Sequence, residues 1–103
     1  MSFEEIVFNI IAYSGDSKGY CFQALSAAKE GNFKECDELM EKSKTELLKA
    51  HHIQTKMIQD EAAGTKQEIN LLMVHAQDHL MNASLAKDLI EEMILMYKKI
   101  DLR

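Results

Sequence analysis

The 103-residue sequence predicts an all-α fold, an antiparallel three-helix bundle formed by a single domain over residues 1–103. Hydrophobic residues make up 47% of the chain, which is enough for a core, while proline is absent and glycine occurs only four times. Valine, isoleucine, threonine and aromatic residues do not gather in the short alternating runs that are typical of strands. Three polar residues, each followed three positions later by glutamate, mark three helix starts.

The first helix is expected at about residues 3–30, with Ser2 as its N-cap and Glu5 at the third helical position. An apolar stripe follows at helical spacing. The stretch SGDSKG, residues 14–19, carries two glycines, which each cost on the order of 1 kcal/mol in a helix. Because the apolar spacing resumes in phase at Cys21, one continuous helix is predicted.

The second and third helices are expected at about residues 33–63 and 66–101. Gly31 and Gly64 stand where left-handed C-terminal caps are expected, so they end the helices before them. The polar residues that start the new helices, with their glutamates, are Asn32 with Glu35 and Thr65 with Glu68. Because the joints are only a few residues long, neighbouring helices must be antiparallel.

The third helix carries apolar residues over a wider arc than one bundle can bury. One apolar side comprises Leu71, Leu85, Leu89, Met93, Met96 and Ile100, and the positions further round comprise Leu72, Ala76, Ala83, Ile90, Ile94 and Tyr97. A helix that is apolar over such an arc is usually buried from two sides. We therefore expect an oligomer with this helix near its axis. The alternative is an apolar third helix with a partly exposed patch.

Four polar residues interrupt this arc, at spacings of three, four and seven. At about 100° per residue, an arc of roughly 100° contains all of them: His75, Asp78, His79 and Asn82. A buried, ionised Asp78 is costly without a partner, so it needs a proton, a cation or a surface position. Asn82 fits a register-fixing polar residue, as in coiled coils. Gln77 points away from the arc and is expected to be solvated.

Metalloenzyme motifs fit poorly. The sequence contains neither HExxH nor the Glu-x-x-His pair of di-iron bundles. His51 and His52 are adjacent, so they diverge by about 100° on a helix, and a solvated or half-buried pair is expected. Asp78 alone in one chain is no site for Mg²⁺ or Ca²⁺. If the third helix lined a threefold axis, however, three copies of Asp78 would converge there, and they would repel one another or collect a cation.

His75 could act as a nucleophile with fewer supporting groups than a metal site requires. A neutral imidazole is available at cytoplasmic pH, and a ring that is held through one nitrogen presents the other outward. Such a nitrogen can take a phosphoryl group from a donor protein and give it to an acceptor. His79, one turn further on, could donate a hydrogen bond to the phosphoryl oxygens.

Composition argues against several classes of function. A net charge of −5 disfavours nucleic acid and an anionic membrane surface as ligands. No apolar run approaches the roughly 18 residues that span a bilayer, and the acidic start MSFEEIVFNII is no secretory signal. Cys21 and Cys36 form no CxxC motif, so they are expected to be reduced, partly buried thiols of a cytoplasmic protein.

Two segments, MVHAQDHLM (residues 73–81) and LAKDLIEEMILMYKK (residues 85–99), closely resemble the IIA component of the lactose/cellobiose family of the bacterial phosphoenolpyruvate-dependent sugar phosphotransferase system (PTS). The resemblance covers essentially the whole chain. It also includes EEIVFNIIAYSGDSK at the start, ALSAAKEGNF at 24–33 and AHHIQTKMIQDEAAG at 50–64.

This resemblance implies an antiparallel three-helix bundle that assembles as a homotrimer, with the third helices about the axis. His75 matches the family's phosphorylated histidine, and His79 matches the second motif histidine, which lies close to the phosphorylation site. Asp78 matches the aspartate whose three copies gather around a divalent cation, Mg²⁺ or similar.

The implied function is that of a cytoplasmic phosphocarrier, a phosphotransferase component. His75 would accept a phosphoryl group from the phosphorylated histidine carrier protein and pass it to a cysteine of the IIB component. That step drives uptake of a β-linked disaccharide through the membrane component IIC. Cellobiose, other β-glucosides, lactose and chitobiose remain open, with a slight preference for cellobiose or oligo-β-glucosides. The alternatives are a histidine-phosphotransfer domain of a two-component relay, whose usual Lys and Gly are absent from AQDH, and a trimeric helical interaction module.

Overall fold

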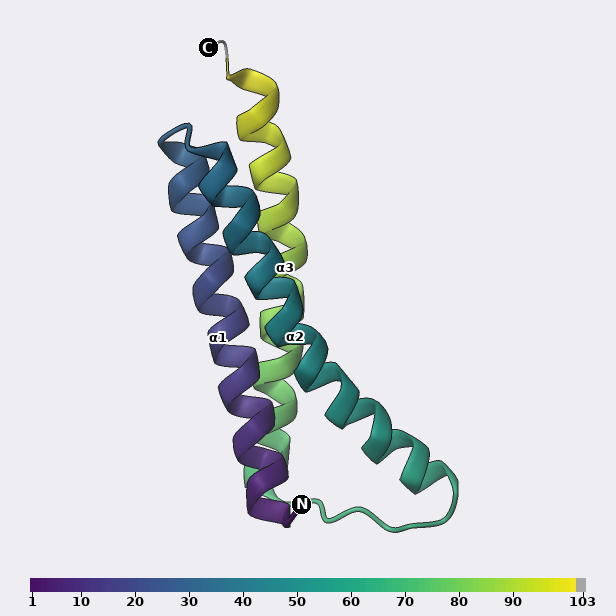
Figure 1. The fold of residues 1–103 in the computed structure, drawn as a ribbon. Coiled ribbons are helices and arrows are strands. Elements are labelled where there is room, and N and C mark those ends of the chain that lie inside the picture. Colours follow the sequence, from purple (N-terminus) through teal and green to yellow (C-terminus); the bar gives the residue numbers. More distant parts are fainter. Residues whose placement is uncertain (102–103) are drawn as a thin grey trace.

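The computed structural model describes residues 1–101 and consists of three long α-helices. They are α1 (Phe3–Lys29), α2 (Phe33–Ala62) and α3 (Leu71–Ile100). The helices α1 and α2 form an antiparallel hairpin, and α3 runs alongside α1 in the same direction as α1 (Figure 1). The predicted all-α class and the continuous first helix are confirmed, and residues 1–101 contain no strand.

The turn between α1 and α2 is built around Gly31, as predicted. Gly31 has a φ of 77°, in the left-handed region that favours glycine. Its N–H donates to the carbonyl of Ala28 at 3.0 Å, and the N–H of Asn32 donates to the carbonyl of Ala27 at 2.9 Å. These two bonds help to satisfy the carbonyls of the last turn of α1.

Side chains cap α1 and α3 but not α2. The Ser2 Oγ accepts a hydrogen bond from the N–H of Glu5 at 3.2 Å, as predicted. The Asn70 Oδ1 accepts from the N–H of Met73 at 3.0 Å and starts α3. Asn32 precedes α2 without such a bond, so the predicted side-chain cap at that position is wrong.

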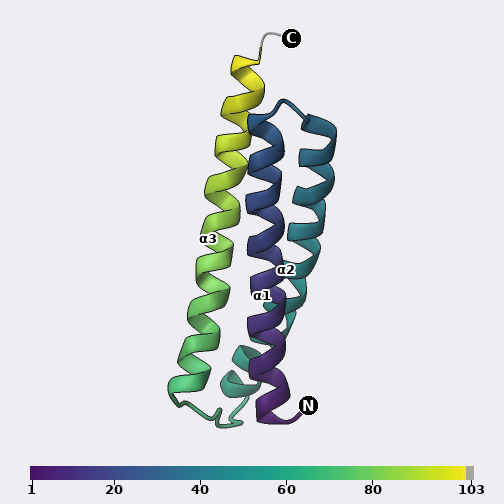
Figure 2. The same ribbon diagram turned by 90° about the vertical axis from the view of Figure 1, so that its left-hand side faces the viewer.

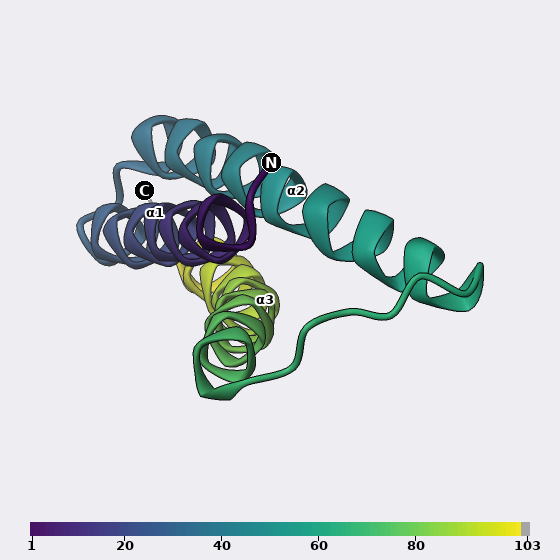
Figure 3. The same ribbon diagram turned by 90° about the horizontal axis from the view of Figure 1, so that it is seen from below.

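The predicted start of the third helix is also wrong, since α3 begins at Leu71. Gly64 has a φ of 102°, and the N–H of Thr65 donates to the carbonyl of Asp60 at 2.9 Å. Thr65 therefore closes the end of α2 and does not open α3. The reason is the direction of α2, whose second half diverges from α1 and α3 (Figures 1 and 3). Because of that divergence, the chain needs an extended segment to return to α3.

The helix α1 is the main packing partner in the bundle. It packs along both α2 and α3, whereas α2 and α3 contact each other over a shorter stretch (Figure 2). Near the hairpin end, the Nζ of Lys98 on α3 lies 2.7 Å from the Oδ1 of Asp37 on α2. The result is an elongated molecule of 56 × 21 × 19 Å.

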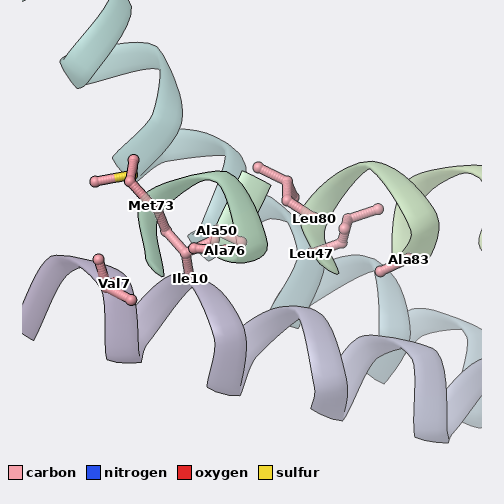
Figure 4. Close-up of a cluster of buried hydrophobic side chains, with 8 residues drawn as sticks. All are labelled: Val7, Ile10, Leu47, Ala50, Met73, Ala76, Leu80 and Ala83. Atoms are coloured by element: carbon pink, nitrogen blue, oxygen red, sulfur yellow. The ribbon is translucent and has the colours of Figure 1, made fainter. Parts of the chain in front are cut away.

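Two apolar clusters fill the core. The first, which we call the site-side cluster, draws on all three helices (Figure 4) and comprises Val7, Ile10, Leu47, Ala50, Met73, Ala76, Leu80 and Ala83. The second, the hairpin-side cluster, comprises Cys21, Ala24, Leu25, Ala27, Ala28, Cys36, Ile90 and Ile94. Burial of this surface supplies the main driving force for folding.

Candidate functional site

The helix α3 carries the four predicted polar residues on the side that faces away from the core. His75, Asp78 and Asn82 are exposed and His79 is half-buried. The same side presents large apolar residues that are 42–84% exposed, which we call the apolar arc: Leu71, Val74, Leu85, Leu89, Met93, Met96 and Ile100. The buried residues of α3 lie on the opposite side: Met73, Ala76, Leu80, Ala83, Ile90 and Ile94. The predicted common arc is confirmed, and it lies outside the core of the bundle.

The rings of His75 and His79 form a pair on successive turns of α3. Their Nε2 atoms lie 3.2 Å apart, within hydrogen-bond distance. The ring centroids are 4.5 Å apart and the ring planes are nearly perpendicular, at 89°. One nitrogen of such a pair must carry a hydrogen while the other offers a lone pair. With the hydrogen on His79, the Nε2 of His75 is unprotonated and nucleophilic.

An apolar hollow lies between α1 and the C-terminal part of α3. Met93 lies 18 residues after His75, and Tyr97 lies 18 residues after His79. Because 18 residues make about five helical turns, Met93 lies on the same side of α3 as His75, and Tyr97 on the same side as His79. Met93 and Tyr97 line this apolar hollow of about 410 Å³ together with Leu25 of α1. The two histidines therefore lie on the same sides of α3 as Met93 and Tyr97, about 27 Å further toward the N-terminus of the helix. The exposed His75 is open there to an approaching protein.

Asp78 lies within the apolar arc and is exposed in the single chain. Its carboxylate forms no hydrogen bond or ion pair with any other residue of the described range. Within residues 1–101, no group of three or more His, Cys, Asp or Glu side chains could hold a metal ion. One chain thus offers a single oxygen donor, and a cation held at Asp78 requires ligands from further subunits.

Gln77 differs from its prediction. It does point away from the apolar arc, but it is half-buried rather than solvated. Its Oε1 accepts a hydrogen bond from the Nε2 of Gln54 on α2 at 2.7 Å, and its Nε2 donates to the Sδ of Met73 at 3.4 Å. Its position between α3 and α2 depends on where α2 packs, which no local pattern of the sequence reports.

The remaining candidate residues of the sequence lie apart from the histidine pair. His51 is half-buried and His52 is exposed, as predicted for a diverging pair on α2. Cys21 and Cys36 are free thiols, as predicted, but both are fully buried, so the expected partial burial is wrong. Burial raises the pKa of the Cys21 thiol, and burial together with the neighbouring carboxylate of Asp37 raises the pKa of Cys36.

Comparison with known proteins decides the family. The family model described as PTS system, Lactose/Cellobiose specific IIA subunit matches residues 5–98. The chain belongs to this family. Such a IIA subunit is a phosphotransferase component that carries a phosphohistidine and takes part in sugar uptake. None of the three helices of the described chain is long and apolar enough to cross a membrane.

Relatives and solved structures cover nearly the whole IIA subunit. The lichenan-specific phosphotransferase enzyme IIA component of Bacillus subtilis is 48% identical over 97 residues, 94% of this chain and 88% of its own length. The N,N'-diacetylchitobiose-specific EIIA component of Escherichia coli K12 is 40% identical, over 94% of this chain and 84% of its own.

Among solved structures, the cellobiose-specific enzyme IIA of Bacillus anthracis has a TM-score of 0.91 at 48% identity, covering 97% of this chain and 93% of that one. The IIA(Chitobiose)–HPr complex of the Escherichia coli phosphotransferase system has a TM-score of 0.83 at 38% identity, covering 97% of both chains. These structures support the three-helix fold of the IIA subunit.

Proposed function

We propose that this IIA subunit is a cytoplasmic phosphocarrier whose phosphohistidine forms on the Nε2 of His75. The observation that carries the proposal is the exposed His75 ring, with its Nε2 3.2 Å from the Nε2 of the half-buried His79. In the first step, the P–N bond to a histidine of the phosphorylated carrier protein breaks as a P–N bond to His75 forms. In the second step, that bond breaks as a P–S bond to a cysteine of the IIB component forms. HPr is the partner in the solved complex of a relative, which supports the donor.

His79 takes the supporting role in this proposal. Its Nε2–H donates to the free Nε2 of His75 in the resting state, which keeps the ring of His75 turned outward. Once the phosphoryl group occupies that nitrogen, the same N–H donates to a phosphoryl oxygen. Phosphoryl transfer depends mainly on positioning and on stabilisation of the oxygens, so one well-placed donor is useful.

A homotrimer with the α3 helices about a threefold axis remains a prediction, which the apolar arc supports. A large contiguous apolar surface on a monomer usually marks an interface. Asp78 lies within that surface, and three copies around an axis would present three carboxylates to one another. Carboxylate oxygens are the ligands that Mg²⁺ prefers, so a bound divalent cation would offset their mutual repulsion and crosslink the helices. Asn82, on the same side, would then fix the register between subunits.

The transported sugar is proposed to be a β-linked disaccharide of the cellobiose or oligo-β-glucoside type, taken up through IIC. Relatives at 48% identity are named for lichenan and cellobiose, whereas those named for chitobiose and lactose are 37–40% identical. Because the IIA subunit transfers only the phosphoryl group, the sugar is recognised by its partners. Binding of nucleic acid and insertion into a membrane are not part of this proposal.

Phosphoryl transfer is the direct test. The purified protein is mixed with phosphoenolpyruvate, enzyme I and the histidine carrier protein, and intact mass is recorded beside a His75→Ala variant. We expect one acid-labile phosphoryl adduct on the wild type and none on the variant. Absence of an adduct on the folded wild type would contradict the proposal. An adduct that persists in the variant would move the site, with His79 as the first candidate.

The metal assignment has its own test, which does not depend on activity. Asp78→Asn removes the negative charge while it keeps the size of the side chain. We expect the variant to lose bound divalent cation, measured by elemental analysis, and to change the stability of the trimer in sedimentation velocity. Unchanged metal content together with unchanged trimer stability would refute the role of Asp78.

A further inference from the structure

All three helices interrupt their apolar faces at the same level of the bundle. The site-side and hairpin-side clusters are separated there, and the buried positions between them are polar. The residues at this level, which we call the polar waist, are Ser14 and Ser17 of α1, Ser43 of α2 and Lys87 of α3. None of these residues belongs to either apolar cluster. The hydrophobic contacts that stabilise the bundle are therefore concentrated above and below the waist.

Ser17 and Ser43 hold α1 against α2 at the waist. The Ser17 Oγ donates to the backbone carbonyl of Ser43 at 2.8 Å, and the Ser43 Oγ donates to the carbonyl of Ser17, also at 2.8 Å. The two hydroxyl oxygens lie 3.0 Å apart, and both side chains are fully buried. These bonds satisfy the polar groups, but such small side chains bury little apolar area.

Ser14 and Lys87 add polar groups that fit the core poorly. The Ser14 Oγ is buried and has no hydrogen-bond partner within residues 1–101. The side chain of Lys87 is only 12% exposed, and its Nζ pairs with the Oε1 of Glu91 at 2.8 Å. An unpartnered buried hydroxyl reduces the net stabilisation of the layer that contains it, and the paired Lys87 adds no apolar side chain to either cluster.

The backbone of α1 is weakest at the same level. Gly15 and Gly19 lie on the exposed side of α1, and a Cβ added at either position would meet no atom within 4 Å. Neither glycine is needed for close packing within the chain, and each lowers helix stability relative to alanine. The weak stretch of helix therefore coincides with the polar waist.

We propose that the polar waist is a built-in flexing point, at which α1 bends or opens locally while the two apolar clusters stay packed. The histidine pair lies on the first turns of α3, whose inner face belongs to the site-side cluster. Flexing at the waist lets the half that carries His75 and His79 adjust to its partners while the hairpin-side cluster stays packed. Segments with few apolar contacts open at lower free energy than the rest of a fold.

Hydrogen–deuterium exchange of the full chain tests the flexing point without reference to phosphoryl transfer. We expect backbone amides of residues 16–20 to exchange roughly tenfold faster than the amides of residues 8–12 and 22–26, which lie on α1 beside the two apolar clusters. Gly15→Ala combined with Gly19→Ala is expected to slow exchange at the waist by roughly three- to tenfold. Ser26→Ala, an exposed substitution on α1 away from the waist, should change nothing there. Uniform exchange along α1 in the wild type would overturn the proposal.

A second experiment, which rests on the proposed function, tests whether flexing at the polar waist serves phosphoryl transfer at His75. Ser14→Ala removes the unpartnered hydroxyl at a buried position that no partner protein can touch. If flexing serves transfer, both Ser14→Ala and the double glycine variant should slow phosphorylation of His75 several-fold, with unchanged helix content. A slowing with the glycine variant alone would identify a surface contact and overturn the link to flexing. Absence of phosphorylation in the wild type would contradict the proposed function but leave the exchange result standing.

Discussion

At the scale of single residues, His75 and His79 differ in exposure although their Nε2 atoms lie 3.2 Å apart. The exposed ring of His75 can meet a partner protein, whereas the ring of His79 is partly covered by the rest of the chain. Both rings are in place before any phosphoryl group arrives. The geometry therefore favours His75 as the acceptor and His79 as the group that holds the phosphoryl oxygens.

His79→Ala should slow phosphorylation of His75 by roughly 10- to 100-fold, because it removes the hydrogen-bond donor beside the acceptor nitrogen. His79→Gln, which retains an N–H donor, should recover part of the rate. Rapid-quench measurement of transfer from the phosphorylated carrier protein, with the lifetime of the phosphohistidine, checks both variants. Wild-type rates and lifetimes in His79→Ala would remove His79 from the mechanism.

The two cysteines should be inert in the folded protein. Burial raises the pKa of Cys21 and of Cys36, so neither thiol ionises near neutral pH. We expect no reaction with a maleimide at pH 7 until the chain unfolds in urea, when both thiols react. Because the folded state holds the thiol protons more tightly, stability should fall as pH rises above the ordinary thiol range of about 8.5. Rapid labelling of either thiol in the folded protein would contradict this expectation.

At the scale of elements, the helix ends show how a local pattern succeeds or fails. Ser2 caps α1 through its side chain, as its spacing from Glu5 indicates. Thr65 and Glu68 have the same spacing, yet the backbone of Thr65 is used to close α2. The difference arises because the second half of α2 diverges from the bundle, so the chain after Gly64 runs in extended form back to α3 (Figure 1). Tertiary packing supplies most of the stability of a helix, and without it the capping pattern is insufficient.

The two asparagine N-caps provide a matched test of these ends. Asn70→Ala should lower the free energy of unfolding by roughly 1 kcal/mol, because its side chain accepts the hydrogen bond from Met73. Asn32→Ala should have little effect, since the side chain of Asn32 makes no capping bond. Urea denaturation followed by circular dichroism measures both. Equal losses for the two variants would show that the caps are not as the structure describes.

At the scale of the whole molecule, the apolar arc of α3 is the feature that a single chain leaves unexplained. Its residues are 42–84% exposed, although the opposite side of the same helix is closely packed. Burying that surface against copies of itself would stabilise the assembly by about 25 cal/mol for each Å² of apolar area removed from water. In the proposed homotrimer the arc would also bring Asp78 into the same interface, so assembly would be coupled to cation binding.

Leu89→Lys should break the proposed homotrimer without unfolding the helices, because it places a charge in the apolar arc, where the side chain is 50% exposed in the single chain. Leu95→Lys is the matched control. Leu95 is 57% exposed on the same helix but lies outside the arc. Sedimentation equilibrium should report monomers for the first variant and the wild-type assembly for the second, with equal helix content by circular dichroism. A trimer that survives Leu89→Lys would place the interface elsewhere.

The sequence by itself determined the number and approximate extent of the helices, the glycine turns and the side of α3 that carries the histidines. These features follow from helical periodicity and from contacts between residues a few positions apart, which a sequence states directly. Only the tertiary structure decided where α3 begins, that Gln77 bonds to Gln54, and that serines join α1 to α2 between two separate clusters. Those features depend on where one helix crosses another, and that is set by the packing of whole apolar faces rather than by local spacing.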